Sequence, residues 1–211
     1  MAIIDDISTA LQKGKVKDVV SLIEQALNEG ISAQDILDKG LLYGMSLLGA
    51  RFKNNEVFVP EVLVAARALN KGTEALKPRL IEAGVKPIGK VVLCTVKGDL
   101  HDIGKNLVRM MLEGAGFEVI DLGVDIDENK IVDAVKEHKP QILCLSALLT
   151  TTMSQQGVVI EALKTAGLRD NVKIMVGGAP VTQSFCESIH ADAYSQDAAS
   201  AAEKAKTFVV N

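Results

Sequence analysis

The second half of this 211-residue chain alternates short apolar runs with segments of helical periodicity. The runs lie within residues 91–96, 117–121, 142–146 and 172–176. Their spacing leaves room for helices at about 104–115, 127–138, 152–166, 180–189 and 197–208. Strands that alternate with helices are typical of right-handed crossovers. We therefore predict a parallel sheet that is covered by helices on both faces.

The first half lacks such runs and reads as helix throughout. Apolar residues recur at helical spacing from Ile7 to Leu27, and again from Ile36 to Leu48. Pro60 suits the first turn of a final helix. Because the connections between these segments are short, we predict a small bundle of four helices.

Proline and glycine lie close together in residues 85–90 and interrupt the helical pattern. We predict a domain boundary there, with the helical bundle over residues 1–86 and an α/β domain over residues 87–211. A weak last strand near Ala193 and Tyr194 would give a flavodoxin-like (Rossmann-like), doubly wound, five-stranded parallel sheet. In such sheets ligands lie beyond the carboxyl ends of the strands.

Composition argues against several classes of partner. Lys and Arg number 23 and Asp and Glu 27, for a net charge of −4, and no basic run indicates nucleic acid or an anionic membrane surface. No apolar stretch approaches the about 18 residues of a transmembrane helix, and the N-terminus lacks the layout of a signal peptide. Cys94, Cys144 and Cys186 stand singly, so neither a disulfide framework nor a CxxC metal site is predicted. We expect a cytoplasmic protein.

Polar residues and glycines gather where the predicted strands end. His101 follows the first strand, with Asp99 two residues before it, and Gly123 follows the second. Ser146 closes the third strand, and Gly177-Gly178 follow the fourth. The carboxyl ends of parallel strands share one edge, so these residues predict a site there. A histidine so placed can be a metal ligand whose other ring nitrogen is held by a carboxylate.

Three of these motifs together resemble the cobalamin-binding signature DxHxxG–SxL–GG. They are Asp99-x-His101-x-x-Gly104, Ser146-x-Leu148 and Gly177-Gly178, in matching order and at fitting separations. The helical half contains a segment, residues 52–62, that looks like the cap module beside that domain in methionine synthase and in small corrinoid proteins. Nearly the whole chain is thus similar to the corrinoid proteins of methanol and methylamine methyltransferase systems.

The resemblance implies a role for each motif. His101 would be the lower axial ligand of cobalt once the cofactor's own base has left, the arrangement called base-off/His-on, and Asp99 would accept a hydrogen bond from its other ring nitrogen. Ser146 would extend this pair into a His–Asp–Ser relay. Gly104 and Gly177-Gly178 would leave room for the displaced nucleotide tail. The further cofactor contacts that we expect in this domain are Asp102, Ile103, Gly123, Leu148 and Thr150.

In the cap, the family positions imply that Phe52, Phe58, Val59 and Val62 shield the upper face of the cofactor. The implied function is a methyl carrier that binds cobalamin or a related corrinoid and shuttles a methyl group through cobalt(I) and methyl-cobalt(III). Such a protein is not catalytic alone. Its implied partners are a substrate-specific methyltransferase, a second methyltransferase that methylates a folate or a thiol, and a reductive activation protein, with no nucleic acid or membrane.

Other functional classes stay open at this point. A small subunit of an adenosylcobalamin mutase would need open access, against which the Phe-bearing cap argues. A corrinoid-dependent sensor normally brings an output domain, and no basic helix-turn-helix-like segment is present. A hydrolase triad of Asp99, His101 and Ser146 lacks the G-x-S-x-G elbow. The methyl donor also stays open among methanol, a methylamine, a methoxylated aromatic and a betaine, because the partner methyltransferase and not this chain selects it.

Overall fold

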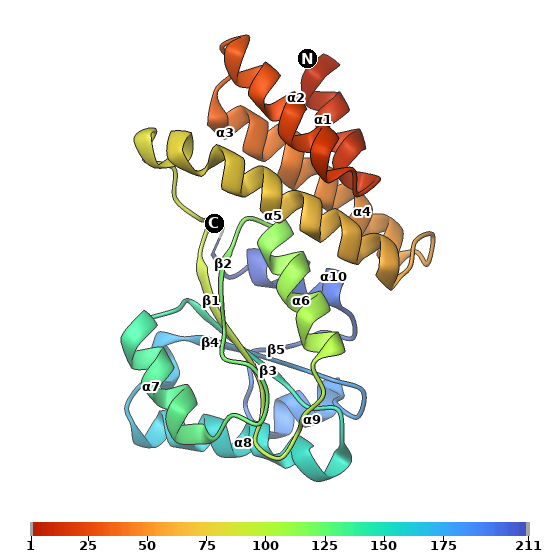
Figure 1. The fold of residues 1–211 in the computed structure, drawn as a ribbon. Coiled ribbons are helices and arrows are strands. Elements are labelled where there is room, and N and C mark those ends of the chain that lie inside the picture. The colour runs from red at the N-terminus through yellow and green to blue at the C-terminus, as the bar shows by residue number, and fades with distance from the viewer. Residues whose placement is uncertain (1, 210–211) are drawn as a thin grey trace. The chain divides into compact units, whose positions relative to one another are not determined.

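The computed structural model describes residues 2–209 and contains two compact units (Figure 1). One comprises residues up to Pro87 together with Gly114–Gly116, and the other comprises Ile88–Glu113 and the residues from Phe117 onward. The first unit is helical. The second holds the parallel sheet, so the predicted succession of a helical part and an α/β part is confirmed.

The helical unit contains four helical rods among its described residues, as predicted. They are α1 (Ala2–Gln12), α2 (Val16–Asn28), a continuous stretch of α3 (Ala33–Asp35), η1 (Ile36–Leu42) and α4 (Tyr43–Lys53), and α5 (Val59–Glu82). In Figure 1, α1 and α2 lie side by side, and these two helices contact each other.

Local sequence explains where these helices begin. The Ser32 hydroxyl accepts a hydrogen bond from the backbone N–H of Asp35 at 3.1 Å, which caps α3. Pro60 stands in the first turn of α5, where a missing N–H costs nothing. The sequence did not predict that residues 36–42 take the wider turn of a π-helix. The core of the unit is aliphatic and includes the fully buried residues Ile7, Leu11, Ile23, Ile36, Leu41, Leu48 and Leu76.

The second unit is a five-stranded parallel sheet in the order β2-β1-β3-β4-β5. Its strands are β1 (Lys90–Thr95), β2 (Glu118–Asp121), β3 (Ile142–Ser146), β4 (Lys173–Gly177) and β5 (Ala193–Tyr194). Its helices are α6 (Ile103–Gly114), α7 (Glu128–His138), α8 (Thr150–Thr165), α9 (Gln183–Ser188) and α10 (Ala198–Lys206), with a 3-10 turn, η2 (Arg169–Asn171). The predicted doubly wound sheet, including its short last strand, is confirmed.

The core of the sheet unit follows from the alternation of side chains along its strands. Val92, Cys94 and Leu143 point to one face, where they pack with Ile131 of α7 and Ile160 of α8. Helices α7 and α8 lie next to each other on this side of the sheet (Figure 1). The strand ends are therefore held by a rigid layer of packed aliphatic side chains.

The three cysteines are free thiols and all are buried. Burial raises the pKa of the Cys144 thiol to about 12, which keeps it protonated and unreactive. The three buried thiols therefore act as small apolar residues of the core.

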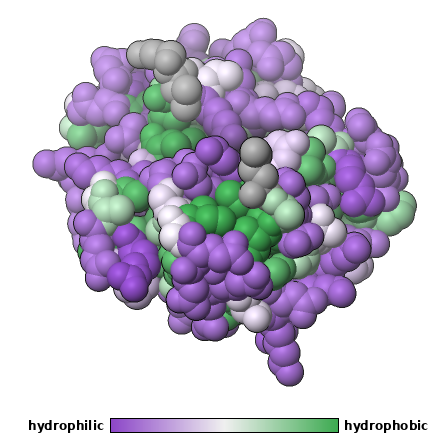
Figure 2. Space-filling model, turned by 90° about the horizontal axis from the view of Figure 1, so that it is seen from above, coloured by the Kyte–Doolittle hydropathy of each residue, from purple (hydrophilic) through white to green (hydrophobic). Residues whose placement is uncertain are grey.

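Within residues 2–209, no helix combines the length and the apolar character that crossing a membrane requires. The face of the molecule in Figure 2 is mainly hydrophilic, with hydrophobic residues in small groups between polar ones. Several large apolar side chains of the sheet unit are nevertheless exposed, and four of them follow the ends of β1 and β3: Leu100, Ile103, Leu148 and Leu149.

Candidate functional site

The site begins where β1 ends. Thr95 is fully buried, and its hydroxyl donates a hydrogen bond of 2.9 Å to the backbone carbonyl of His101. The backbone N–H of His101 donates to Oδ1 of Asp99 at 3.1 Å. The loop between β1 and α6 is therefore curled back on itself, with both backbone polar groups of His101 satisfied inside the unit.

The His101 ring is fixed by Asp99. Its Nδ1 lies 2.7 Å from Oδ1 of the carboxylate, and the side chain is 50% exposed. A carboxylate can only accept, so Nδ1 carries the proton in the neutral ring and the lone pair lies on Nε2. Nε2 has no hydrogen-bond partner among the described residues. The ring thus presents a free, oriented donor atom to the outside.

Asp99 is a fully buried carboxylate that is saturated with donors. Its Oδ2 accepts from the backbone N–H of Leu148 at 2.7 Å, from that of Leu149 at 3.4 Å, and from the Thr152 hydroxyl at 2.7 Å. Burial alone would raise the pKa of Asp99. The hydrogen bonds from Thr152, from the His101 ring and from backbone N–H groups outweigh it and hold the pKa well below its usual range.

The relay differs from the prediction in one member. The hydroxyl that reaches Asp99 belongs to Thr152, whereas the Ser146 hydroxyl makes no hydrogen bond within the described structure. Ser146 is the last residue of β3, and the chain then turns so that the first turn of α8 lies over Asp99. The hydrogen-bonded series is therefore His101–Asp99–Thr152, and the predicted Ser146 link in it is wrong.

The glycines of the signature serve different purposes. A Cβ on Gly104 would meet nothing within 4 Å, and the same holds for Gly123, whose φ is +94°. A Cβ on Gly177 would lie 3.3 Å from the carbonyl oxygen of Ser195. Gly178, with φ +124°, packs so closely on Ala147 that a Cβ would overlap its carbonyl oxygen. Gly178 is thus required by the chain's own backbone, and not by a ligand alone as predicted.

Exposed apolar side chains stand on the segments that carry His101 and the backbone donors to Asp99. Ile103 is 72% exposed, and Leu148 is 42% exposed. Leu100, which is not among the predicted site residues, is as exposed as Ile103. Such exposed apolar residues around a polar donor are typical of a binding surface.

The remaining predicted contacts of this unit are also at the surface. Thr150 is exposed at the start of α8. Asp102 is exposed as well, just before α6, and its Oδ2 accepts a hydrogen bond of 3.1 Å from the Asn106 side chain of that helix. Neither contacts Asp99 or the His101 ring in the hydrogen bonds of the described residues.

A buried ion pair anchors α6 beside this surface. Lys105 is 2% exposed, and its Nζ lies 2.5 Å from Oδ2 of Asp121 at the end of β2. The other oxygen of Asp121 accepts from the backbone N–H of Gly123 at 2.9 Å. A buried cation needs such a partner, so this pair fixes the start of α6, and with it Gly104, against the sheet.

The predicted cap residues occupy different environments in the helical unit. Phe58 is 63% exposed at the start of α5, where its backbone N–H donates to Glu61 at 3.1 Å. Phe52 and Val59 are partly buried. Val62 is fully buried in the core of this unit, so it packs inside the cap and does not present a surface to a ligand here.

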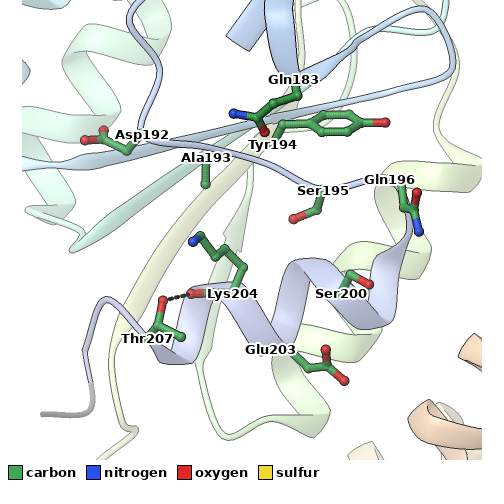
Figure 3. Close-up of a pocket in the computed structure, with 10 residues that line it drawn as sticks. All are labelled: Gln183, Asp192, Ala193, Tyr194, Ser195, Gln196, Ser200, Glu203, Lys204 and Thr207. Carbon is green, nitrogen blue, oxygen red and sulfur yellow. Dashed lines mark hydrogen bonds between the residues drawn. The ribbon is translucent and has the colours of Figure 1, made fainter. Parts of the chain in front are cut away.

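A surface cavity of about 510 Å³ lies elsewhere in the sheet unit, along β5 and α10 (Figure 3). Lys204 points from α10 toward β5, and Tyr194 and Ser195 lie along the other side of the cavity. None of the site residues predicted from the sequence lines it. The candidate site is therefore the surface around His101 and not this cavity.

The residues around His101 fit a large metal-bearing ring. A single imidazole nitrogen with a fixed second nitrogen suits a metal whose other ligands come from a macrocycle. Exposed apolar side chains can contact the face of such a ring, and the open space at Gly104 leaves room for a bulky substituent. His101 would hold the metal, and Asp99 would hold His101.

Family models identify this metal-bearing ring as vitamin B12. Two models, each described as a B12 binding domain, match residues 89–206 and residues 3–77. Trimethylamine corrinoid protein 1 of Methanosarcina acetivorans is 44% identical over 189 residues, which cover 89% of this chain and 88% of that protein. Dimethylamine corrinoid protein of Methanosarcina barkeri is 42% identical over 205 residues, covering 97% of this chain and 96% of that protein.

A solved structure extends the likeness to the fold. A chain of the methanol:cobalamin methyltransferase complex from Methanosarcina barkeri superposes with a TM-score of 0.89 at 32% identity. The match covers 100% of this chain and 80% of that chain. With both halves of the sequence matched and the His101–Asp99 pair in place, the chain belongs to the B12-binding corrinoid proteins of methyltransferase systems, and its cofactor is cobalamin or a related corrinoid.

Proposed function

We propose that this protein is a methyl carrier that binds its corrinoid base-off/His-on, with Nε2 of His101 on cobalt. The observation that carries the proposal is the His101 ring, held at Nδ1 by a buried, ionised Asp99 and without a hydrogen-bond partner at Nε2 within residues 2–209. A carboxylate behind a metal-bound histidine fixes the tautomer and raises the basicity of the donor nitrogen. When bound, the corrinoid supplies the cobalt that accepts and gives up the methyl group.

The chain's own residues prepare this ligand before the cofactor arrives. Thr152 and the backbone N–H of Leu148 hold one carboxylate oxygen, which leaves the other to orient the ring. Because these donors favour the ionised carboxylate, Nδ1–H remains the donor of the pair and the Nε2 lone pair remains directed outward.

The other predicted cofactor contacts complete the proposed binding surface. Ile103, Leu148 and Thr150 would contact the corrin ring and its edge, with Asp102 and Ser146 at the rim. Gly104, Gly123 and Gly177-Gly178 would border the path of the displaced nucleotide tail. In the cap, Phe52, Phe58 and Val59 would shield the upper face, and Phe58 is the most exposed of the predicted cap residues.

We further propose two methyltransferase partners. The relatives named trimethylamine and dimethylamine corrinoid proteins share 44% and 42% identity with this chain, against 32% for the chain of the methanol complex. This difference favours a methylated amine as the source of the methyl group. A second methyltransferase would pass the group to a folate or a thiol, and a reductive activation protein would restore the carrier, all in the cytoplasm.

Electron paramagnetic resonance of the cobalt(II) form tests the axial ligand. The protein is loaded with cobalamin after growth with ¹⁵N-labelled histidine. A nitrogen of spin one splits each cobalt line into three and ¹⁵N splits it into two, so a histidine on cobalt gives doublets. We expect doublets in the wild type and in His138→Ala, and their loss in His101→Ala. Persistent triplets in the labelled wild type would show that cobalamin's own base has stayed bound, and the proposal would be wrong.

The methyl donor is tested separately. The cobalamin-loaded chain is first reduced chemically to cobalt(I), whose electron pair forms the bond to the methyl carbon, and is then offered to purified methyltransferases specific for trimethylamine, dimethylamine and methanol. Methylation is followed by the absorbance of the corrinoid. We expect the fastest methylation with one of the two amine enzymes. Faster methylation with the methanol enzyme would overturn the assignment of the donor and leave the carrier function intact.

A further inference from the structure

Asp125 joins the loop between β2 and α7 to the loop that carries Asp99. Its carboxylate accepts a hydrogen bond of 2.7 Å from the backbone N–H of Gly98. Its own backbone N–H donates to the carbonyl of Asp99 at 3.0 Å. One residue thus holds the main chain on both sides of the Gly98–Asp99 peptide bond.

Neighbouring contacts bring the two loops to this position. The backbone N–H of Ile126 donates to the carbonyl of Thr95 at 3.1 Å, and Ile126 forms an isolated parallel bridge with Val96. Pairing between the segments that follow β1 and β2 thus continues past the end of β2. Asp125 extends it by its hydrogen bonds to Gly98 and Asp99.

The backbone of Asp125 has a conformation that is unusual for a residue with a side chain. Its φ is +54°, in the left-handed region that residues with a Cβ rarely adopt. Glycine would be relaxed there, and aspartate and asparagine are the side chains that tolerate it best. Backbone geometry alone would therefore favour glycine, whereas the contact with Gly98 requires a side chain that accepts a hydrogen bond.

We propose that Asp125 is a positioning residue for the cobalt ligand. The inference rests on the proposed function, since it assigns to Asp125 the placement of Asp99 and, through Asp99, of His101. Asp99 and His101 are linked both by side chain and by backbone, so a shift in the main chain at Asp99 moves the imidazole. Groups that support a ligating histidine from behind commonly change metal affinity 10–100-fold when they are removed.

Three variants separate the side chain from the backbone. Asp125→Gly removes the acceptor and relaxes the left-handed conformation. Asp125→Asn keeps an acceptor oxygen and tolerates the same φ. Asp127→Asn is the matched control: Asp127 lies two residues further along the loop, where its carboxylate accepts from the backbone N–H groups of Asn129 and Lys130 and caps α7.

The full chain of each variant is titrated with cobalamin, and the cobalt(II) form is examined with ¹⁵N-labelled histidine. Thermal unfolding without cofactor checks that each variant is folded. For Asp125→Gly we expect the dissociation constant to rise about tenfold and the histidine doublets to be lost or broadened in part of the sample. For Asp125→Asn and Asp127→Asn we expect doublets like the wild type and affinities within about twofold.

The outcomes distinguish this inference from the proposed function. Wild-type doublets together with a folded Asp125→Gly that matches the wild type in signal and affinity would overturn the role of Asp125 and leave His101 as ligand. Wild-type triplets would overturn the proposed function itself. If Asp125→Gly does not fold, Asp125→Ala, which also lacks an acceptor, replaces it with the same expected result. Failure of both to fold would mean that Asp125 acts in folding and not in positioning, which also overturns the inference.

Discussion

The hydroxyl of Thr152 donates a hydrogen bond of 2.7 Å to Oδ2 of Asp99, while Oδ1 of the same carboxylate holds the His101 ring at 2.7 Å. Thr152 comes from the first turn of α8, and Asp99 from the loop after β1. Both side chains are buried. The hydrogen bond therefore joins two elements that are far apart in the sequence and does so out of reach of water, where a missing donor is costly.

Replacing Thr152 by valine is expected to destabilise the protein without cofactor. Valine has nearly the shape of threonine but leaves the buried Asp99 carboxylate with one donor fewer, so the free energy of unfolding should fall by about 1–3 kcal/mol. Urea denaturation measures it. Thr152→Ser keeps the hydroxyl and should cost less. Ser146→Ala is the control, with an expected change within about 0.5 kcal/mol. If Ser146→Ala lost as much stability as Thr152→Val or more, the hydrogen-bonded series would have to run through Ser146 instead of Thr152.

The acid dependence of stability is expected to report on Asp99. Its pKa is depressed in the folded protein, whereas in the unfolded chain it is about 3.9. A depressed pKa stabilises the fold above the unfolded value, and this contribution is lost as the pH falls toward the folded value. Below about pH 4 the wild type should lose up to about 1.4 kcal/mol per pH unit through this group.

Asp99→Asn separates that loss from the titration of other carboxylates. We expect the variant to be less stable than the wild type at pH 7, and the difference between their free energies of unfolding to shrink between about pH 4 and pH 3. The exposed Asp102→Asn should show little difference from the wild type at any pH. A difference for Asp99→Asn that stays constant down to pH 3 would contradict the pKa assigned to Asp99.

The parts of the site that the sequence predicted are those encoded over short distances. Asp99 and His101 are two residues apart after a strand, so their contact depends on one loop and could be expected from the spacing. Four of the five strands were predicted for a similar reason, since apolar runs of strand length mark buried strands locally.

Thr152 and Asp125 were missed because their contacts join segments that are far apart in the sequence. Thr152 is one of three consecutive threonines, and only the turn from β3 into α8 decides which of them reaches Asp99. Asp125 reaches Gly98 because the loops after β1 and β2 lie side by side, which depends on the pairing of those strands. Spacing along one sequence does not specify such long-range hydrogen bonds.

Gly178→Ala is expected to disrupt the sheet unit even without cofactor. The new methyl group would overlap the carbonyl oxygen of Ala147, and a φ of +124° is unfavourable for any residue with a Cβ. Strain and overpacking of this kind each cost about 1–3 kcal/mol, so we expect a loss of about 2–6 kcal/mol or failure to fold. Gly177→Ala is the comparison, because its Cβ would lie 3.3 Å from the Ser195 carbonyl oxygen and should cost less. A Gly178→Ala protein as stable as the wild type would contradict this packing.

Gly104→Ala is expected to separate stability from cofactor binding. Gly104 stands in the first turn of α6, and a Cβ there meets nothing within 4 Å, so the protein without cofactor should be as stable as the wild type or gain up to about 1 kcal/mol from the better helix former. The same methyl group would enter the space that we assign to the displaced nucleotide tail of the corrinoid. Crowding in a packed site commonly costs about 1–3 kcal/mol. Because about 1.4 kcal/mol corresponds to a factor of ten, we expect the dissociation constant for cobalamin to rise about tenfold or more. Urea denaturation without cofactor and titration with cobalamin measure the two effects on one sample of protein. Unchanged affinity in a folded Gly104→Ala protein would mean that the open space at Gly104 faces water in the loaded protein, and Gly104 would not border the path of the nucleotide tail.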